Sequence, residues 1–166
     1  MAYVIIKIYN FLVGIWSFVV NSIYWVFHFL SIKNARHEKS LVALQMKHNG
    51  IDFLPNIMMH HHQWTSDGIL ADWRPWIVTM IDRGSRDDCD GAAYLARWLL
   101  SIVDRKSRIV TLMDGWKFWG AHVVCYCPGL KLMVSNSNVV YFTDDNWKKN
   151  IWEHFKEFGR DYNVIV

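Results

Sequence analysis

An uncharged apolar stretch near the start of the chain constrains the fold most. Residues 8–32 contain 25 consecutive positions without a Lys, Arg, Asp or Glu. About 20 apolar residues in a helix suffice to cross the hydrocarbon core of a bilayer. The stretch therefore predicts a hydrophobic helix over residues 1–32. Because Asn10, Asn21 and His28 lie inside it, burial against another protein, with these polar groups paired, is the alternative to a membrane span.

Basic residues follow the apolar stretch more often than they precede it. Lys7 lies before it, whereas Lys33, Arg36 and Lys39 lie after it. By the positive-inside tendency, this excess predicts that the main domain lies on the cytoplasmic side of a membrane. A cleaved secretory signal is not favoured, because a charged leading region and a small-residue cleavage site are both missing. We expect a protein that is associated with a membrane or is part of a larger protein assembly.

The remaining composition excludes several functional classes. The formal net charge is only +3, and the basic residues are interspersed with acidic ones, so nucleic-acid binding is not predicted. Three cysteines form neither a zinc pattern nor an even disulfide set. The run at residues 60–62 (three adjacent histidines) and the aspartates at 87, 88 and 90 lack the ligand spacing of zinc or calcium sites. We expect no metal and no cofactor, and we interpret the histidine run as a polar loop.

Periodicity divides the rest of the chain into helices and short strands. Residues 33–60 are predicted to form a helical connector, and residues 61–166 to form an α+β domain. Ala and Leu recur at helical spacing from Asp88 onward, which is typical of a buried helix. Turn residues separate four β-rich runs that predict an antiparallel meander, followed by a helix and a last strand. The runs are 108–113, 121–127, 131–134 and 139–142, the helix starts near residue 147, and the strand covers 162–166.

One cysteine and one histidine have the arrangement that nucleophilic catalysis requires. Cys89 opens the buried helix, where unpaired backbone N–H groups and the helix dipole favour a thiolate. His122 follows on a predicted strand and can accept and return the proton. The end of the next strand offers Ser135, Asn136 and Asn138 as orienting groups, and Asn136 is preferred because an amide oxygen accepts the imidazole N–H better than a hydroxyl does. The predicted triad is Cys89, His122 and Asn136.

Four further residues are predicted to complete a substrate cleft around Cys89. The oxyanion of an acyl-transfer intermediate needs hydrogen-bond donors. The backbone N–H of Cys89 and a side chain from Gln63 or Trp64 can supply them. Trp116 and Trp119, in the loop before His122, are predicted to wall the cleft.

Three short motifs resemble a known family. Residues 72–76 (DWRPW), 83–92 (RGSRDDCDGA) and 120–124 (GAHVV) are similar to the motifs of the transglutaminase-like, papain-related family, specifically its bacterial transglutaminase-like cysteine proteinase branch. The resemblance implies a papain/transglutaminase-like core, in which a nucleophile helix packs on a small antiparallel sheet. It also implies hydrolysis of an amide or peptide bond, for example in peptidoglycan. Gly91 replaces a second acidic residue of the motif, and Ser135 stands where the family has an acidic residue.

Two other functions stay open. The charges of Asp87, Asp88 and Asp90 oppose formation of a thiolate at Cys89, which favours a buried structural cysteine. The chain would then be a catalytically inactive structural or interaction protein of the same fold, for example in a phage virion. The apolar helix alone would also fit a small pore-forming or membrane-remodelling protein that associates in several copies.

Overall fold

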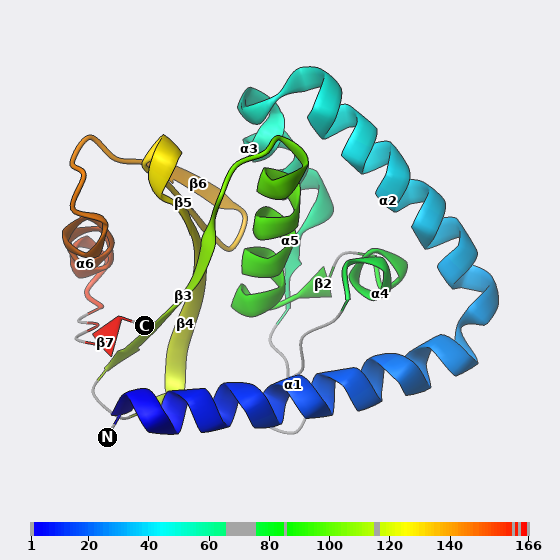
Figure 1. Cartoon of the computed structure of the whole chain (residues 1–166), viewed down its shortest axis with the longest axis horizontal. Helices are drawn as coiled ribbons and strands as arrows, with labels where there is room; N and C mark the ends of the chain where they lie inside the picture. The colour runs from blue at the N-terminus through cyan, green and yellow to red at the C-terminus, as the bar shows by residue number, and fades with distance from the viewer. Residues whose placement is uncertain are drawn as a thin grey trace.

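Two long helices at the start of the chain lie along two sides of the molecule (Figure 1). α1 spans Ala2–Phe27 and α2 spans Phe29–Asn49. They meet at a break at His28, whose ring stacks on that of Tyr24 with centroids 4.0 Å apart. The apolar sequence predicted as one helix over residues 1–32 is therefore shared between α1 and the first turn of α2. The computed structural model describes residues 2–65, 76–84, 86–114, 117–160, 162 and 164–165.

A five-stranded antiparallel sheet forms the centre of the domain. Its strand order is β6-β5-β4-β3-β7, so the predicted meander is present as β3 to β6, and the last strand joins the opposite edge beside β3. The strands cover Arg108–Asp114 (β3), Lys117–Cys127 (β4), Leu132–Ser135 (β5), Asn138–Tyr141 (β6) and Val164–Ile165 (β7). Together with the helices, this sheet confirms the predicted α+β class.

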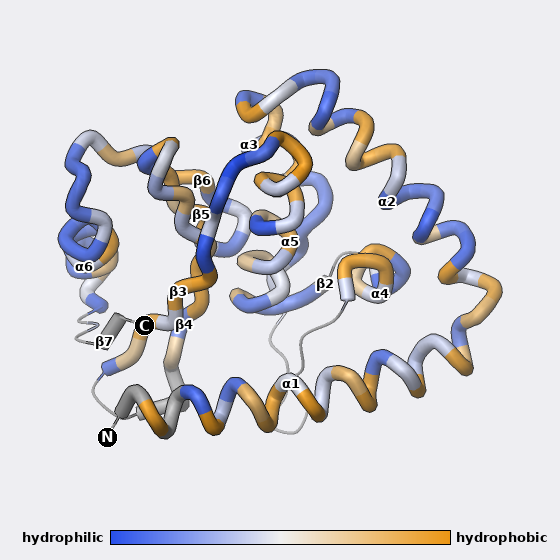
Figure 2. The backbone as a smooth tube through the Cα atoms, viewed as in Figure 1, coloured by the Kyte–Doolittle hydropathy of each residue, from blue (hydrophilic) through white to orange (hydrophobic). Residues whose placement is uncertain are grey.

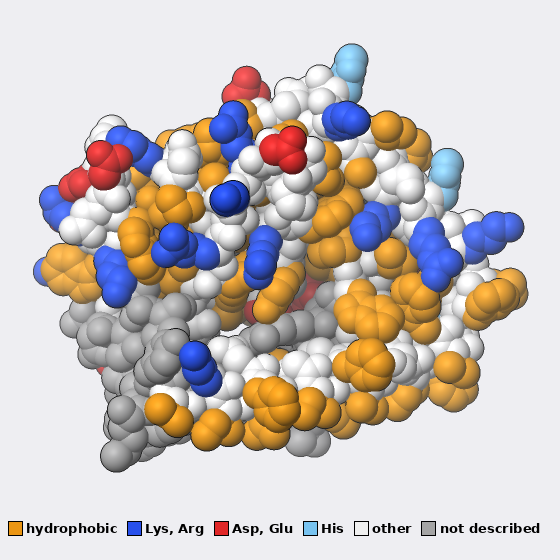
Figure 3. All heavy atoms as spheres, in the orientation of Figure 1, with side chains coloured by type: hydrophobic (Ala, Val, Ile, Leu, Met, Phe, Trp, Pro, Cys, Tyr) orange, Lys and Arg blue, Asp and Glu red, His pale blue; other side chains and the backbone are white. Residues whose placement is uncertain are grey.

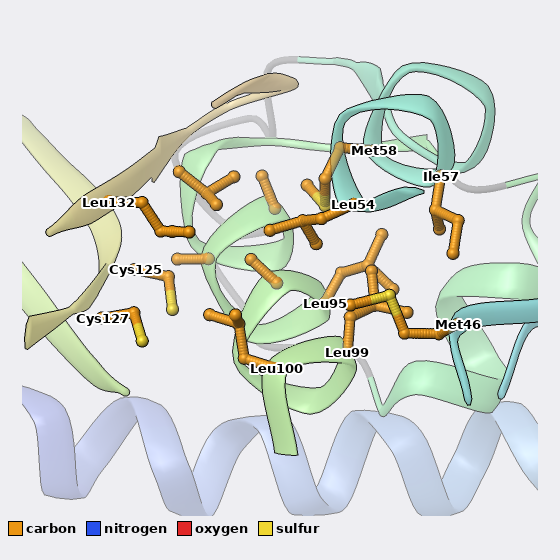
Figure 4. Packing of buried hydrophobic residues seen from close by; sticks show 14 of the residues in the cluster. Met46, Leu54, Ile57, Met58, Leu95, Leu99, Leu100, Cys125, Cys127 and Leu132 are labelled. Atoms are coloured by element: carbon orange, nitrogen blue, oxygen red, sulfur yellow. The ribbon is translucent and has the colours of Figure 1, made fainter. Parts of the chain in front are cut away.

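α5, which spans Cys89–Ile102, is the central helix of the larger hydrophobic core. Its Ala and Leu side chains are buried between the sheet on one side and α2 and α3 on the other (Figure 4). Cys125 and Cys127 are free thiols that both contact this core, as expected for alternate residues of one strand. This core includes the following buried residues, which are labelled in Figure 4: Met46, Leu54, Ile57, Met58, Leu95, Leu99, Leu100, Cys125, Cys127 and Leu132.

The opposite face of the sheet is covered by α6, which spans Trp147–Glu157. Ile151 and Phe155 pack there against the sheet in a second core. Asn146 caps α6 by accepting a hydrogen bond from the Lys149 backbone N–H at 3.2 Å. The Asp144 carboxylate in turn accepts a hydrogen bond from the Asn146 backbone N–H at 2.8 Å, just before the helix begins.

Short elements connect the helices to the sheet. α3 begins at Leu54, with Pro55 in its first turn, and α4 is closed by Gly84 in the left-handed region at φ +73°. β1 and β2 form a small parallel pair of their own. These elements are η1 (Ile51–Phe53), α3 (Leu54–His61), β1 (Gln63–Trp64), α4 (Ile77–Asp82), β2 (Arg86–Asp87) and η2 (Pro128–Leu130).

Apolar side chains cover the outer side of α1. Hydrophobic residues recur along the helix in Figure 2, and Figure 3 shows apolar side chains along this edge of the molecule. In the described part of the chain, the stretch Lys7–Phe27 is the one helical segment long and apolar enough to cross a membrane, and most of it is not buried.

Candidate functional site

Cys89 is held at the first turn of α5 by a network of aspartates. The Asp88 carboxylate caps the helix by accepting from the Asp90 backbone N–H at 3.0 Å. The Asp87 carboxylate accepts from the Asp88 N–H, also at 3.0 Å. Two of the three carboxylates that the sequence places around Cys89, those of Asp87 and Asp88, therefore accept backbone hydrogen bonds at the helix start.

The parallel pair β1–β2 brings a second segment to the same place. Trp64 pairs with Asp87, and the Thr65 N–H donates to the Asp87 carbonyl at 2.8 Å. Trp64 lies in the cavity beside Cys89, as the predicted cleft requires. Gln63 is exposed on the same strand but does not line this cavity. Side chains alternate along a strand, so the two neighbours point in different directions.

His122 is oriented by Ser135. Its Nε2 atom lies 2.8 Å from the Ser135 hydroxyl oxygen. Because β4 pairs with β5 in the register Cys125 to Val134, Ser135 falls opposite Val124. Alternate residues of a strand share a face, so the His122 and Ser135 side chains lie on one side of the sheet.

The preference for Asn136 as the orienting residue is therefore wrong in this geometry. Asn136 has left β5 and occupies the turn to β6 in the left-handed region at φ +51°. In the described residues its side-chain oxygen is buried with no hydrogen-bond partner, and the residue lines a cavity that His122 also lines. Asn136 lines this cavity, whereas Ser135 is the residue hydrogen-bonded to the imidazole.

Two adjoining cavities form the candidate cleft. A cavity of about 330 Å³ contains both Cys89 and His122 in its lining, together with Trp64 and Arg160. A second cavity of about 760 Å³ extends over Asn136 toward α6. The two cavities share four lining residues: Trp64, His122, Arg160 and Tyr162. A continuous surface therefore leads from the thiol past the imidazole.

The imidazole has one nitrogen left for the thiol. In the tautomer in which the Nε2–H donates to the Ser135 hydroxyl, Nδ1 is unprotonated and can accept a hydrogen bond. Within the described residues, no hydrogen bond joins the Cys89 thiol to the His122 ring. The geometry therefore supplies a shared cavity, which Cys89 lines together with the imidazole that Ser135 orients.

Burial keeps both groups neutral. Burial, reinforced by the charges of Asp88 and Asp90, raises the pKa of the Cys89 thiol to about 12, although the backbone of Val123 favours the thiolate. Burial also lowers the pKa of His122 to about 4, and the Arg160 charge adds to this effect. The resting pair is thus a thiol and a neutral imidazole. The thiolate predicted from the helix start is not the resting form, because desolvation outweighs the helix dipole.

His62 is a site residue that the sequence interpretation missed. The histidine run is not a polar loop: His60 and His61 end α3, and His62 is almost fully buried. Its Nε2–H donates to the Asp88 carbonyl at 3.1 Å, and its Nδ1 lies 3.0 Å from the Ser137 hydroxyl. His62 therefore links the start of α5 to the turn that follows Ser135.

A periodic signal for His62 was present in the sequence. The buried face of α3 contains Leu54, Ile57 and Met58, and position 62 follows Met58 by one helical turn. Burial lowers the pKa of His62, so the neutral imidazole is the form that bridges the two elements.

Two predicted cleft residues are not placed by the structure. Trp116 lies outside the described residues. The backbone of Trp119 belongs to β4, but its side chain lies outside the described part, as do residues 66–75 with most of the tryptophan-containing motif. The walls that these residues were expected to form stay predictions.

Close packing explains why residue 91 is a glycine. A Cβ atom at this position would overlap the Asp87 carboxylate, which lies directly against the α5 backbone. Gly91, which stands where the motif has an acidic residue, therefore leaves room for the buried Asp87 side chain.

Asp87, Asp88 and Asp90 are the described residues that could offer ligands to a metal ion. One carboxylate oxygen from each lies within 4.8 Å of the others. Oxygen ligands of this kind suit a hard cation. Asp87 and Asp88 already accept backbone hydrogen bonds, so these two carboxylates also serve to build the start of α5.

Comparisons of this chain with protein-family models, with curated proteins and with solved structures found no match.

Replacing Gly91 with Ala is expected to destabilise the protein although Ala is the better helix former. Overpacking against Asp87 costs about 1–3 kcal/mol, which exceeds the gain of up to about 1 kcal/mol in helix propensity. Chemical denaturation should show a lower unfolding midpoint. Gly129→Ala is the matched control, since nothing lies within 4 Å of a Cβ there. Equal stability of the two variants would contradict the proposed contact.

Acidification is expected to destabilise the fold through His122. Its folded-state pKa of about 4 lies below the ordinary value of 6.5, so the unfolded chain binds more protons between these values. This contribution is complete above pH 6.5 and falls as the pH approaches 4, by about 3 kcal/mol in total. Denaturation at several pH values should show a smaller decline for His122→Gln than for the parent. Identical declines would show that His122 is not buried as a neutral group.

Proposed function

We propose that this protein is a cysteine hydrolase that cleaves an amide or peptide bond, with a transglutaminase-like arrangement of Cys89 and His122. One observation carries the proposal: the thiol at the start of α5 and the imidazole of β4 line the same cavity. The hydrogen bond that the Nε2–H of His122 donates to the Ser135 hydroxyl oxygen supports it further, because it leaves Nδ1 as the base. The papain-like relation of the core is part of the same proposal.

The neutral pair defines how attack would begin. Cys89 Sγ forms a bond to the substrate carbonyl carbon while its proton passes to His122 Nδ1. Because the proton leaves during attack, no stable thiolate is required beforehand. His122 then protonates the leaving amine, the C–N bond breaks, and a thioester remains on Cys89.

Water completes the cycle by the reverse proton path. His122 removes a proton from the water as it attacks the thioester, and the thiol is released with that proton. The oxyanion formed in both steps needs donors. The Cys89 backbone N–H lies at the helix start, where it has no intrahelical partner, and Trp64 lines the same cavity, so its indole N–H is the second candidate donor.

Arg160 indicates the charge of the substrate. Its guanidinium lines both cavities, and in the described part of the chain no ion pair joins it to a carboxylate. Guanidinium groups bind carboxylates with paired hydrogen bonds. Asn136 adds a buried carbonyl oxygen that can accept an N–H group. We therefore propose a peptide substrate with a free carboxylate near the cleaved bond, a description that peptidoglycan stem peptides fit.

The exposed apolar surface of α1 indicates where the proposed hydrolase would be attached. Its outer apolar side chains are exposed along most of the helix, which supports attachment of the domain to a membrane or to neighbouring subunits of a virion or envelope assembly. Of these, we propose a membrane as the partner.

An inactive structural protein of the same fold is the alternative. The raised pKa of Cys89 favours it, because a buried neutral thiol is also what a structural cysteine would be. The exposed apolar surface of α1 would then be the functional part of the molecule.

Incubation with muropeptides and with a peptide mixture, followed by mass spectrometry of new termini, tests the hydrolase. We expect cleavage that falls at least about 100-fold in Cys89→Ser and in His122→Gln, because each removes a group that reacts. Cys127→Ser is the matched control, since that thiol is buried in the core away from the cleft. Cleavage that survives in Cys89→Ser, or no cleavage by the parent, would favour the inactive alternative.

The same assay addresses the substrate charge. Arg160→Gln should raise KM for peptides with a free carboxylate while leaving kcat and the cleavage of amidated peptides nearly unchanged. Equal losses for both peptide types would contradict a role of Arg160 in carboxylate binding.

A further inference from the structure

We infer that α1 lies in the plane of an anionic membrane surface and does not cross the bilayer. The inference rests on the membrane association proposed above but not on the hydrolase. It follows from which side of α1 faces the domain, from what lies beside the middle of the helix, and from the charges next to it.

The polar side of α1 faces the protein. Ser17 and Asn21 are nearly fully buried, and the Asn21 side-chain oxygen accepts from the Trp76 backbone N–H at 2.9 Å. Tyr24 donates to the Asp82 carboxylate at 2.8 Å, and the Trp25 indole donates to the Thr79 hydroxyl at 3.1 Å. α1 is therefore docked laterally along α4 by specific hydrogen bonds.

The apolar side of α1 faces away from the protein. At about 100° per residue, Ile8, Ile15, Val19 and Val26 fall on one line along the helix. All four are exposed, and Val26 reaches 76%. A surface helix of a water-soluble domain packs its apolar side against the core and exposes its polar side to solvent. α1 does the opposite.

Two basic residues of the domain line a hollow beside the middle of α1. Gly14, Ser17 and Phe18 line a hollow of about 850 Å³ between α1, α4 and α5, and the same hollow is lined by Lys39 and Arg97. If docked α1 crossed a bilayer, it would carry these cations and the start of α4 into the hydrocarbon. Charged side chains there are unfavourable. The docked helix can instead place its outer face in the interface between headgroups and acyl chains.

The basic residues near α1 indicate which lipid headgroups the helix would contact. Residues 1–37 contain Lys7, Lys33 and Arg36 but no Asp or Glu. Lys7 lies near the beginning of α1, whereas Lys33 and Arg36 lie in the first turns of α2, so basic residues stand at both ends of α1. Such cations attract anionic headgroups. Because the helix does not cross, the excess of basic residues after it serves lipid contact and does not set a transmembrane orientation.

Nitroxide labels at Ile8, Ile15 and Val26, one at a time in the full-length Cys89→Ser chain, would measure the depth of each position in phosphatidylglycerol-containing vesicles. Ile8 and Val26 are about 27 Å apart along the helix, which is nearly the hydrocarbon thickness. An in-plane helix predicts three similar depths of about 5–10 Å. A deep Ile15 between two shallow ends would show a crossing helix and overturn the inference.

Vesicle cosedimentation separates failure of the geometry from failure of membrane association. We expect the parent protein to bind pure phosphatidylcholine vesicles at least tenfold more weakly than phosphatidylglycerol-containing vesicles. Ile15→Glu should weaken binding to the phosphatidylglycerol-containing vesicles by at least the same factor. Leu44→Glu is the matched control, because Leu44 is an equally bare apolar residue on α2. If the parent binds no vesicles and forms a dimer that Ile15→Glu dissociates, a second copy covers this face and the membrane proposal itself fails.

Discussion

Burial of α5 is the constraint on which the rest of the structure depends. The helix is packed between the sheet on one side and α2 and α3 on the other, so its position along the sheet is fixed by many apolar contacts. Its first residue, Cys89, is consequently placed beside β4 at the level of His122. Asp87, Asp88 and His62 then tie this helix start to β1, to β2 and to the turn after β5. The cleft is a consequence of core packing and of these few polar contacts.

The electrostatics of the cleft result from two opposed effects. A helix start favours a thiolate by at most about 1–2 kcal/mol, whereas burial beside two aspartates acts in the other direction and determines the result. His122 responds to the same burial by remaining neutral at ordinary pH. A neutral pair is compatible with general-base catalysis, in which the proton moves during attack, and it protects the thiol from unspecific reactions.

Much of the fold could be predicted from local patterns, and less of the site. The Ala and Leu spacing of α5 and the turn residues between strands are local signals, so the sequence predicts both the helix and the meander. Ser135 was ranked below Asn136 because the choice depends on strand register and on the turn at Asn136, which are tertiary features. The docking of α1 through Asn21 depends on α4, more than 50 positions away, and composition alone does not reveal it.

The pH dependence of Cys89 alkylation by iodoacetamide, followed by intact mass with His122→Gln as the comparison, tests the central claim most directly. The account predicts slow labelling at neutral pH that continues to rise above the free-thiol pKa of about 8.5, because the resting thiol is protonated. Fast labelling with a plateau below neutral pH, lost in His122→Gln, would show a preformed thiolate–imidazolium pair and contradict the neutral site.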